Sequence, residues 1–114
     1  MKNAFITAIL AIGLAFIPVN AQALTMKQFM QICHSAKSKC SQHPVLNAYI
    51  GGSLDLFAAL QEQNLFKTKD FCANARPHFN VPAIIDHMEK NQAAYANKNA
   101  MLSLVSYFKK KGGC

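Results

Sequence analysis

Acidic residues are scarce in this 114-residue chain, which has five Asp and Glu against twelve Lys and Arg. A glycoside hydrolase needs two carboxyl groups about 5 to 10 Å apart across a cleft, and the spacing of Asp55, Glu62 and the other acids gives no sign of such a pair. The chain also lacks a glycine-rich phosphate loop and a Cys-x-x-Cys-His run for covalent haem. We therefore expect a protein that is not an enzyme, with no catalytic residues and no cofactor.

Arginine is nearly absent, and the lysines are dispersed. Arg76 is the only arginine, and Lys109–Lys111 is the only run of lysines. The formal net charge of +7 would suit a nucleic-acid partner, but dispersed lysines more often keep a surface hydrated or steer an acidic partner. We expect no nucleic-acid binding, and a mild preference for an acidic protein or an anionic envelope surface.

The first 23 residues have the pattern of a secretory signal peptide. Lys2 precedes an almost uninterrupted apolar stretch over residues 4–19, and Ala21-Gln22-Ala23 provides a small-x-small cleavage site. A membrane anchor is the alternative, but Pro18 interrupts the stretch, which is shorter than the roughly 20 residues that cross a bilayer. We predict that residues 1–23 are cleaved, which leaves residues 24–114 as a single periplasmic domain without a stable membrane anchor.

All four cysteines, Cys33, Cys40, Cys72 and Cys114, lie in the predicted mature part. An even number of cysteines in a small exported domain indicates disulfides, and four cysteines allow three connectivities. On an unbroken helix Cys33 and Cys40 would be about 10 Å apart, beyond disulfide reach, so that pairing requires a chain break at Ser38. We therefore favour the pairs Cys33–Cys114 and Cys40–Cys72.

Two other roles for these cysteines fit the pattern less well. Cys40 and His43 have a spacing found in zinc sites, but Cys72 has no Cys or His within five residues to form a second close pair. Cys33 and His34 are adjacent, and adjacent helical residues point about 100° apart, so they cannot face each other as a thiol and its base. Cys33 could also meet His78 or His87 through the fold, but an exported thiol among four is more often half of a disulfide. We expect no metal site and no thiol catalysis.

Hydrophobic periodicity predicts four helices and almost no strand. Thr25 and Gln28 have the spacing of a capping box, and Pro44 and Pro82 suit the first turn of a helix. The pattern fails between Gln63 and Asn80, a stretch too long for a plain loop in so small a domain. The predicted helices cover residues 26–37, 44–60, 82–90 and 94–108. The fold class is thus all-α, a small disulfide-linked bundle of about four helices.

Two glycines, Gly51 and Gly52, lie inside the second predicted helix. Each costs roughly 1 kcal/mol relative to alanine in a helix interior. A close approach by a neighbouring backbone and a mild kink would each account for them. We expect this part of the helix to be crowded or bent.

Four segments share residues with a known family: Leu24-Thr25-x-x-x-Phe29-x-x-x-Cys33, the run from Ala48 to Asp55, Phe71-Cys72, and a helical tail that ends in Cys114. In these the chain resembles the Rap/Tai family of exported immunity proteins. The resemblance implies a non-catalytic periplasmic protein that binds and inhibits a peptidoglycan-degrading effector of type VI secretion, notably an amidase. Two features depart from the family pattern, the long separation of Cys40 from Tyr49 and the Gly-Cys ending.

An inhibitor of this kind would block the active cleft of its target with an ordered protrusion. The segment over residues 67–79 is our candidate, with Arg76, His78 and Phe79 as partner contacts.

Other functions stay open at this point. A small periplasmic stress chaperone of the acid-resistance type is one, since four histidines change charge near pH 6; a secreted effector or conjugation accessory factor is another. A homodimer is also compatible with the sequence, because Tyr49, Phe57 and Tyr107 exceed what a thin core would cover.

Overall fold

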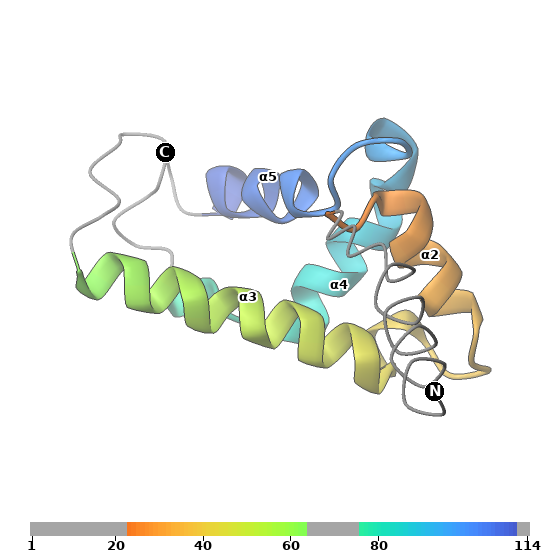
Figure 1. The fold of residues 1–114 in the computed structure, drawn as a ribbon, viewed down its shortest axis with the longest axis horizontal. Helices are drawn as coiled ribbons and strands as arrows, with labels where there is room; N and C mark the ends of the chain where they lie inside the picture. The colour runs from red at the N-terminus through yellow and green to blue at the C-terminus, as the bar shows by residue number, and fades with distance from the viewer. Residues whose placement is uncertain (1–22, 64–75, 112–114) are drawn as a thin grey trace, which may run out of the picture.

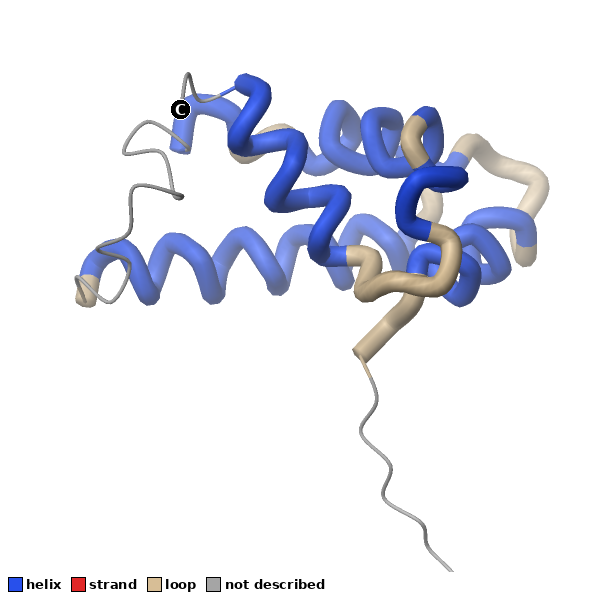
Figure 2. The backbone as a smooth tube through the Cα atoms, turned by 90° about the horizontal axis from the view of Figure 1, so that it is seen from above, coloured by secondary structure: helices blue, strands red, loops and turns tan. Residues whose placement is uncertain are grey.

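The structure is a computed structural model that describes residues 23–63 and 76–111. These residues form α2 (Met26–His34), η1 (Cys40–Gln42), α3 (Pro44–Glu62), η2 (Arg76–His78), α4 (Val81–Lys90), η3 (Gln92–Tyr95) and α5 (Met101–Lys111), where η denotes a 3₁₀ turn. Figures 1 and 2 show only helices and connecting turns in the described part. The predicted all-α, disulfide-linked bundle of four helices is confirmed.

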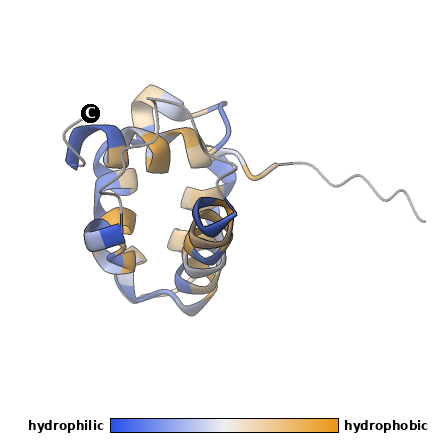
Figure 3. Ribbon diagram, turned by 90° about the vertical axis from the view of Figure 1, so that its left-hand side faces the viewer, coloured by the Kyte–Doolittle hydropathy of each residue, from blue (hydrophilic) through white to orange (hydrophobic). Residues whose placement is uncertain are grey.

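Helix α4 lies between α3 and α5 and packs against both (Figure 1). Its Ile84, Ile85 and Met88 side chains are completely buried. The apolar sides of the helices face one another across the interior, while polar residues face outward (Figure 3). Burial of each aliphatic side chain stabilises the fold by about 1.5 to 3 kcal/mol, so this short central helix carries a large share of the core.

Local capping sets the helix starts, as the sequence predicted. The Thr25 hydroxyl accepts a hydrogen bond from the Gln28 N–H at 3.2 Å, and the Gln28 side-chain oxygen accepts one from the Thr25 N–H at 2.9 Å. Pro44 is the first residue of α3. Asn80 caps α4, and Pro82 occupies its first turn. The capping box and the two proline starts are therefore correct.

The predicted single helix over residues 94–108 is wrong. After η3 ends at Tyr95, the carbonyls of Ala96 and Lys98 accept hydrogen bonds from the first two N–H groups of α2, each at 3.0 Å. The first N–H groups of any helix lack a partner within it. The Asn99 side-chain oxygen then accepts a bond from the first N–H of α5 at 2.9 Å. The chain leaves the helical path here because its backbone caps another helix.

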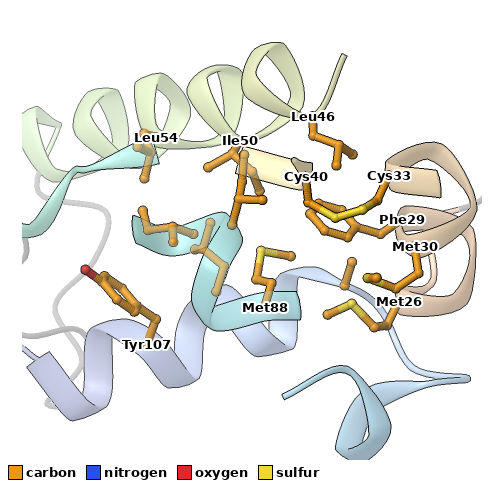
Figure 4. Packing of buried hydrophobic residues seen from close by; sticks show 14 of the residues in the cluster. Met26, Phe29, Met30, Cys33, Cys40, Leu46, Ile50, Leu54, Met88 and Tyr107 are labelled. Carbon is orange, nitrogen blue, oxygen red and sulfur yellow. A yellow bond between two sulfur atoms is a disulfide. The ribbon is translucent and has the colours of Figure 1, made fainter. Parts of the chain in front are cut away.

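Cys33 and Cys40 form a disulfide, with their Cα atoms 4.8 Å apart. Both residues are buried in the core (Figure 4). The predicted pairs Cys33–Cys114 and Cys40–Cys72 are therefore wrong, since each uses a sulfur that is already bonded. The same bond excludes Cys33 and Cys40 as zinc ligands. Cys72 and Cys114 lie outside the described residues.

The chain break that this disulfide requires comes earlier than Ser38. Helix α2 ends at His34, where the Ser35 hydroxyl donates to the Ile32 carbonyl at 2.6 Å. His43 is buried and caps α3, because its Nδ1 accepts a bond from the Val45 N–H at 3.2 Å. With Nδ1 accepting, Nε2 carries the proton and donates to the Ser35 hydroxyl, 3.1 Å away. His43 thus holds the turn that brings the two sulfurs together.

The aromatic side chains that indicated a dimer are accommodated within one chain. Tyr107 is 7% exposed. The Tyr49 ring lies 6.4 Å from that of Phe29, and the Phe57 ring meets that of Phe108 edge-on at 6.4 Å. These contacts remove the reason given for a homodimer, whose existence stays a prediction.

Gly51 and Gly52 lie in open surroundings. A methyl group placed on either Cα would meet nothing within 4 Å in the described structure. The predicted crowding is therefore wrong as far as the described residues are concerned, whereas the alternative of a bend in the helix stays a prediction. No packing contact among the described residues offsets the low helix propensity of these glycines.

We expect Gly52→Ala to raise the free energy of unfolding by about 1 kcal/mol, since alanine has the higher helix propensity and fits the space. Urea denaturation measures the change. Ala48→Gly, also at an exposed position on α3, is the matched control and should lower the stability by a similar amount. A loss of stability in Gly52→Ala would show that a contact outside the described residues fills this position.

Replacing both members of the disulfide, as Cys33→Ala/Cys40→Ala, should lower the free energy of unfolding by about 2.5 kcal/mol. That is the loop-closure term for the sequence separation of 7 residues. Cys72→Ala/Cys114→Ala is the comparison variant and should keep the Cys33–Cys40 bond. Peptide mapping without reductant checks the pairing, and a peptide linking Cys33 to Cys114 would contradict the structure.

Candidate functional site

The predicted partner contacts lie at the edge of the described structure. Arg76 and His78 are in η2, and Arg76 forms an exposed ion pair with Glu62 at 2.7 Å. Phe79 is half-buried, with its ring 5.5 Å from that of Phe108. The Arg76 side chain is thus available to a partner. The Phe79 ring is partly used in packing against Phe108, and only its exposed part could contact a partner. The rest of the predicted protrusion, residues 67–75, lies outside the described residues.

A second candidate site, which the sequence analysis did not identify, lies between α4 and α5. We call it the basic cleft, and its volume is about 400 Å³. Its lining combines three lysines and a histidine with one acidic residue, two further polar side chains and an alanine. The residues are Ala83, Asp86, His87, Lys90, Asn91, Tyr107, Lys110 and Lys111. The cleft therefore offers many hydrogen-bond donors and little negative charge.

His87 joins the two helices that form the basic cleft. Its Nε2 lies 3.2 Å from the Ser106 hydroxyl, and its Nδ1 lies 3.4 Å from the Asn91 side-chain nitrogen. The His87 ring also meets the Tyr107 ring edge-on at 5.2 Å. The Asn91 amide donates to Nδ1, so Nδ1 accepts and the proton of the neutral ring is on Nε2, from which it is donated to Ser106. These bonds fix the imidazole at the cleft.

The environment of His87 disfavours its charged form. Burial lowers the pKa of His87 below its usual value, and the nearby positive charges of Lys110 and Lys111 lower that pKa further. The effect of Lys110 and Lys111 on His87 indicates positive potential at the imidazole. The signal in the sequence was the run Lys109–Lys111, but nothing local indicated that two of its lysines lower the pKa of His87.

A separate groove, also of about 400 Å³, lies between α2 and η3. Met26 and Met30 form part of its lining, with Lys27, Gln31 and His34 contributing polar groups. The segment of residues 96–100 that caps α2 also holds this part of the fold together. The groove is mainly apolar and differs in character from the basic cleft.

Comparison with known proteins gives no relative: no protein-family model, curated protein or solved structure matches the chain. Within residues 23–63 and 76–111, no helix has the length and hydrophobicity needed to cross a membrane. The same residues hold no group of three or more His, Cys, Asp or Glu side chains arranged to bind a metal ion.

Because the pKa of His87 is lowered in the folded chain, the free energy of unfolding should depend on pH. The unfolded chain protonates His87 more readily than the folded chain does, so folding is favoured above the usual pKa and loses this contribution as the pH falls through the lower folded pKa. Wild-type stability should fall between about pH 8 and pH 5, and His87→Gln should reduce that fall. Urea midpoints across this range test it, with His34→Gln, at an exposed position, as the control. An unchanged slope in His87→Gln would contradict the assignment.

Proposed function

We propose that this chain is a non-catalytic periplasmic immunity protein that binds and inhibits a peptidoglycan amidase delivered by type VI secretion. The observation that carries the proposal is the buried Cys33–Cys40 disulfide, in which Cys33 belongs to a segment that resembles the Rap/Tai family. Disulfides persist in oxidising compartments such as the periplasm and are rare in the cytosol. The bond thus agrees with the signal-peptide pattern of residues 1–23.

Several of the residues that carry the family resemblance lie in the core. Phe29 and Cys33 are buried, Ile50 is completely buried, and Tyr49 packs on Phe29. Asp55 is exposed. A shared scaffold explains such a pattern, because core positions tolerate few changes of volume. The contacts that select a target would then lie on surface residues outside the shared set.

The fold also suits removal of residues 1–23. Leu24, the first residue of the proposed mature chain, packs against the core, and its carbonyl accepts a hydrogen bond from the Ala100 N–H at 2.8 Å. The next residue, Thr25, forms the capping box of α2. A chain that begins at Leu24 keeps all of these contacts.

Arg76 is suited to meet an acidic group on the target. Its side chain is 57% exposed and that of Glu62 is 66% exposed. An exposed ion pair contributes only about 0 to 1 kcal/mol, so exchanging Glu62 for a carboxylate of the partner costs little. We propose Arg76 and His78 as contacts, with the exposed part of Phe79 beside them.

Co-expression tests the proposed function. Neighbouring open reading frames are directed to the periplasm of a sensitive host, with and without this chain. We expect one of them to arrest growth and the full-length chain to restore it. Deletion of residues 1–23 should abolish protection, because the inhibitor would no longer reach the compartment of the toxin. If no neighbour is toxic, or if the exported chain fails to rescue, the proposal is wrong.

Two variants separate the interface from the fold in the same experiment. Arg76→Ala should weaken protection while changing the free energy of unfolding by less than about 1 kcal/mol. Glu62→Ala breaks the same ion pair but leaves Arg76 in place, so it should protect as well as the wild type. Equal protection by both variants would remove Arg76 from the interface.

A further inference from the structure

We propose that the basic cleft between α4 and α5 binds a phosphate group. The cleft gathers Lys90 from one helix and Lys110 and Lys111 from the other around the imidazole of His87. This site is independent of the proposed immunity function and of Arg76.

The charge of the lining favours a dianion. Lys90, Lys110 and Lys111 face one acidic residue, Asp86, so with His87 neutral the lining has a formal charge of +2. A phosphate monoester carries about −1.5 to −2 at neutral pH, whereas a single carboxylate carries −1. A phosphate group therefore balances the lining more fully than one carboxylate does.

The shape of the site indicates a discrete group rather than an extended surface. The three lysines are exposed, and they line an open hollow of about 400 Å³. That volume lies within the range of small-molecule sites. The fixed His87 and Asn91 side chains add polar groups at the wall.

A structural explanation for the lysines accounts for only part of the arrangement. Cations in the last turn of a helix stabilise its negative end, and Lys109, Lys110 and Lys111 all lie in the last turn of α5. Lys109 does not line the cleft, whereas Lys110 and Lys111 do. Both of these also act on His87 across the interface between the helices. Lys110 and Lys111 therefore contribute positive charge to the cleft in addition to any effect at the end of α5.

Titration with inorganic phosphate, followed by NMR at constant ionic strength, tests the site. Phosphate between about 1 and 30 mM should give saturable shifts confined to residues of the cleft. It should also raise the pKa of His87, because an anion stabilises the imidazolium. Lys110→Gln/Lys111→Gln should weaken binding by about tenfold or more. Absence of saturable shifts, or shifts spread evenly over the surface, would overturn the proposal.

Two control variants distinguish phosphate binding at the cleft from an effect of overall charge and from an effect of the charge at the end of α5. Lys37→Gln/Lys39→Gln removes the same charge from exposed positions outside the cleft and should change phosphate affinity by less than about twofold. Lys109→Gln removes a cation from the last turn of α5 and should have an equally small effect. If either control weakens binding as much as the cleft variant does, the phosphate site is refuted. Circular dichroism confirms that each variant is folded.

The source of the phosphate is identified by a second arm with phosphatidylglycerol vesicles. Vesicle binding that requires Lys110 and Lys111 and is displaced by inorganic phosphate would identify a lipid headgroup. Specific phosphate binding without vesicle binding would identify a free phosphate compound. Vesicle binding that the cleft variant leaves unchanged, together with no phosphate shifts at the cleft, would overturn the site.

Discussion

The burial of α4 between α3 and α5 is the interaction on which the rest of the structure depends. An isolated helix of this length is unstable in water, because helix nucleation is costly and few turns follow it. The helical state of Val81–Lys90 must therefore come from the contacts of Ile84, Ile85 and Met88, which are completely buried. In return these side chains supply the surface on which both neighbouring helices pack. The 3₁₀ turn at Cys40 packs on α4 as well, so the disulfide connects α2 to the same centre.

The same short helix contributes to the core and to the basic cleft. The apolar positions lie on one side, while Asp86, His87 and Lys90 line the cleft on another, as helical periodicity requires. The position of His87 relative to the lysines of α5 is thus set by how tightly α4 and α5 pack. A substitution of a core residue that packs against Met88 would shift α4 relative to α5. It would thereby alter the spacing of charges in the cleft although no charged residue is replaced. Stability and any anion binding are therefore linked in this fold.

Signals carried by a few neighbouring residues predicted the fold, and the errors occurred where the chain responds to distant segments. The capping box at Thr25 and the prolines at the starts of α3 and α4 involve residues within one helical turn, so the sequence reveals them. The break after Tyr95 could not be predicted in this way, because the carbonyls that leave the helical path bond α2, some seventy residues earlier. The disulfide was missed for a different reason: α2 ends at His34, and the Ser35–His43 hydrogen bond across the following turn accompanies the approach of Cys33 to Cys40. Hydrophobic periodicity reports which face of a helix is buried and does not predict hydrogen bonds of this kind.

The basic cleft shows the limit of sequence reasoning for the site. A run of lysines at the end of a helix has an adequate local explanation in hydration and the helix dipole, so Lys109–Lys111 gave no cause to look further. Only the packing of α5 on α4, through His87, Ser106 and Tyr107, determines which of those lysines line a hollow. Asp86 is the one acidic residue among the described residues that line the cleft, so this lining carries a net positive charge. The fold thus brings Lys90 of α4 and Lys110 and Lys111 of α5 to the lining of one hollow.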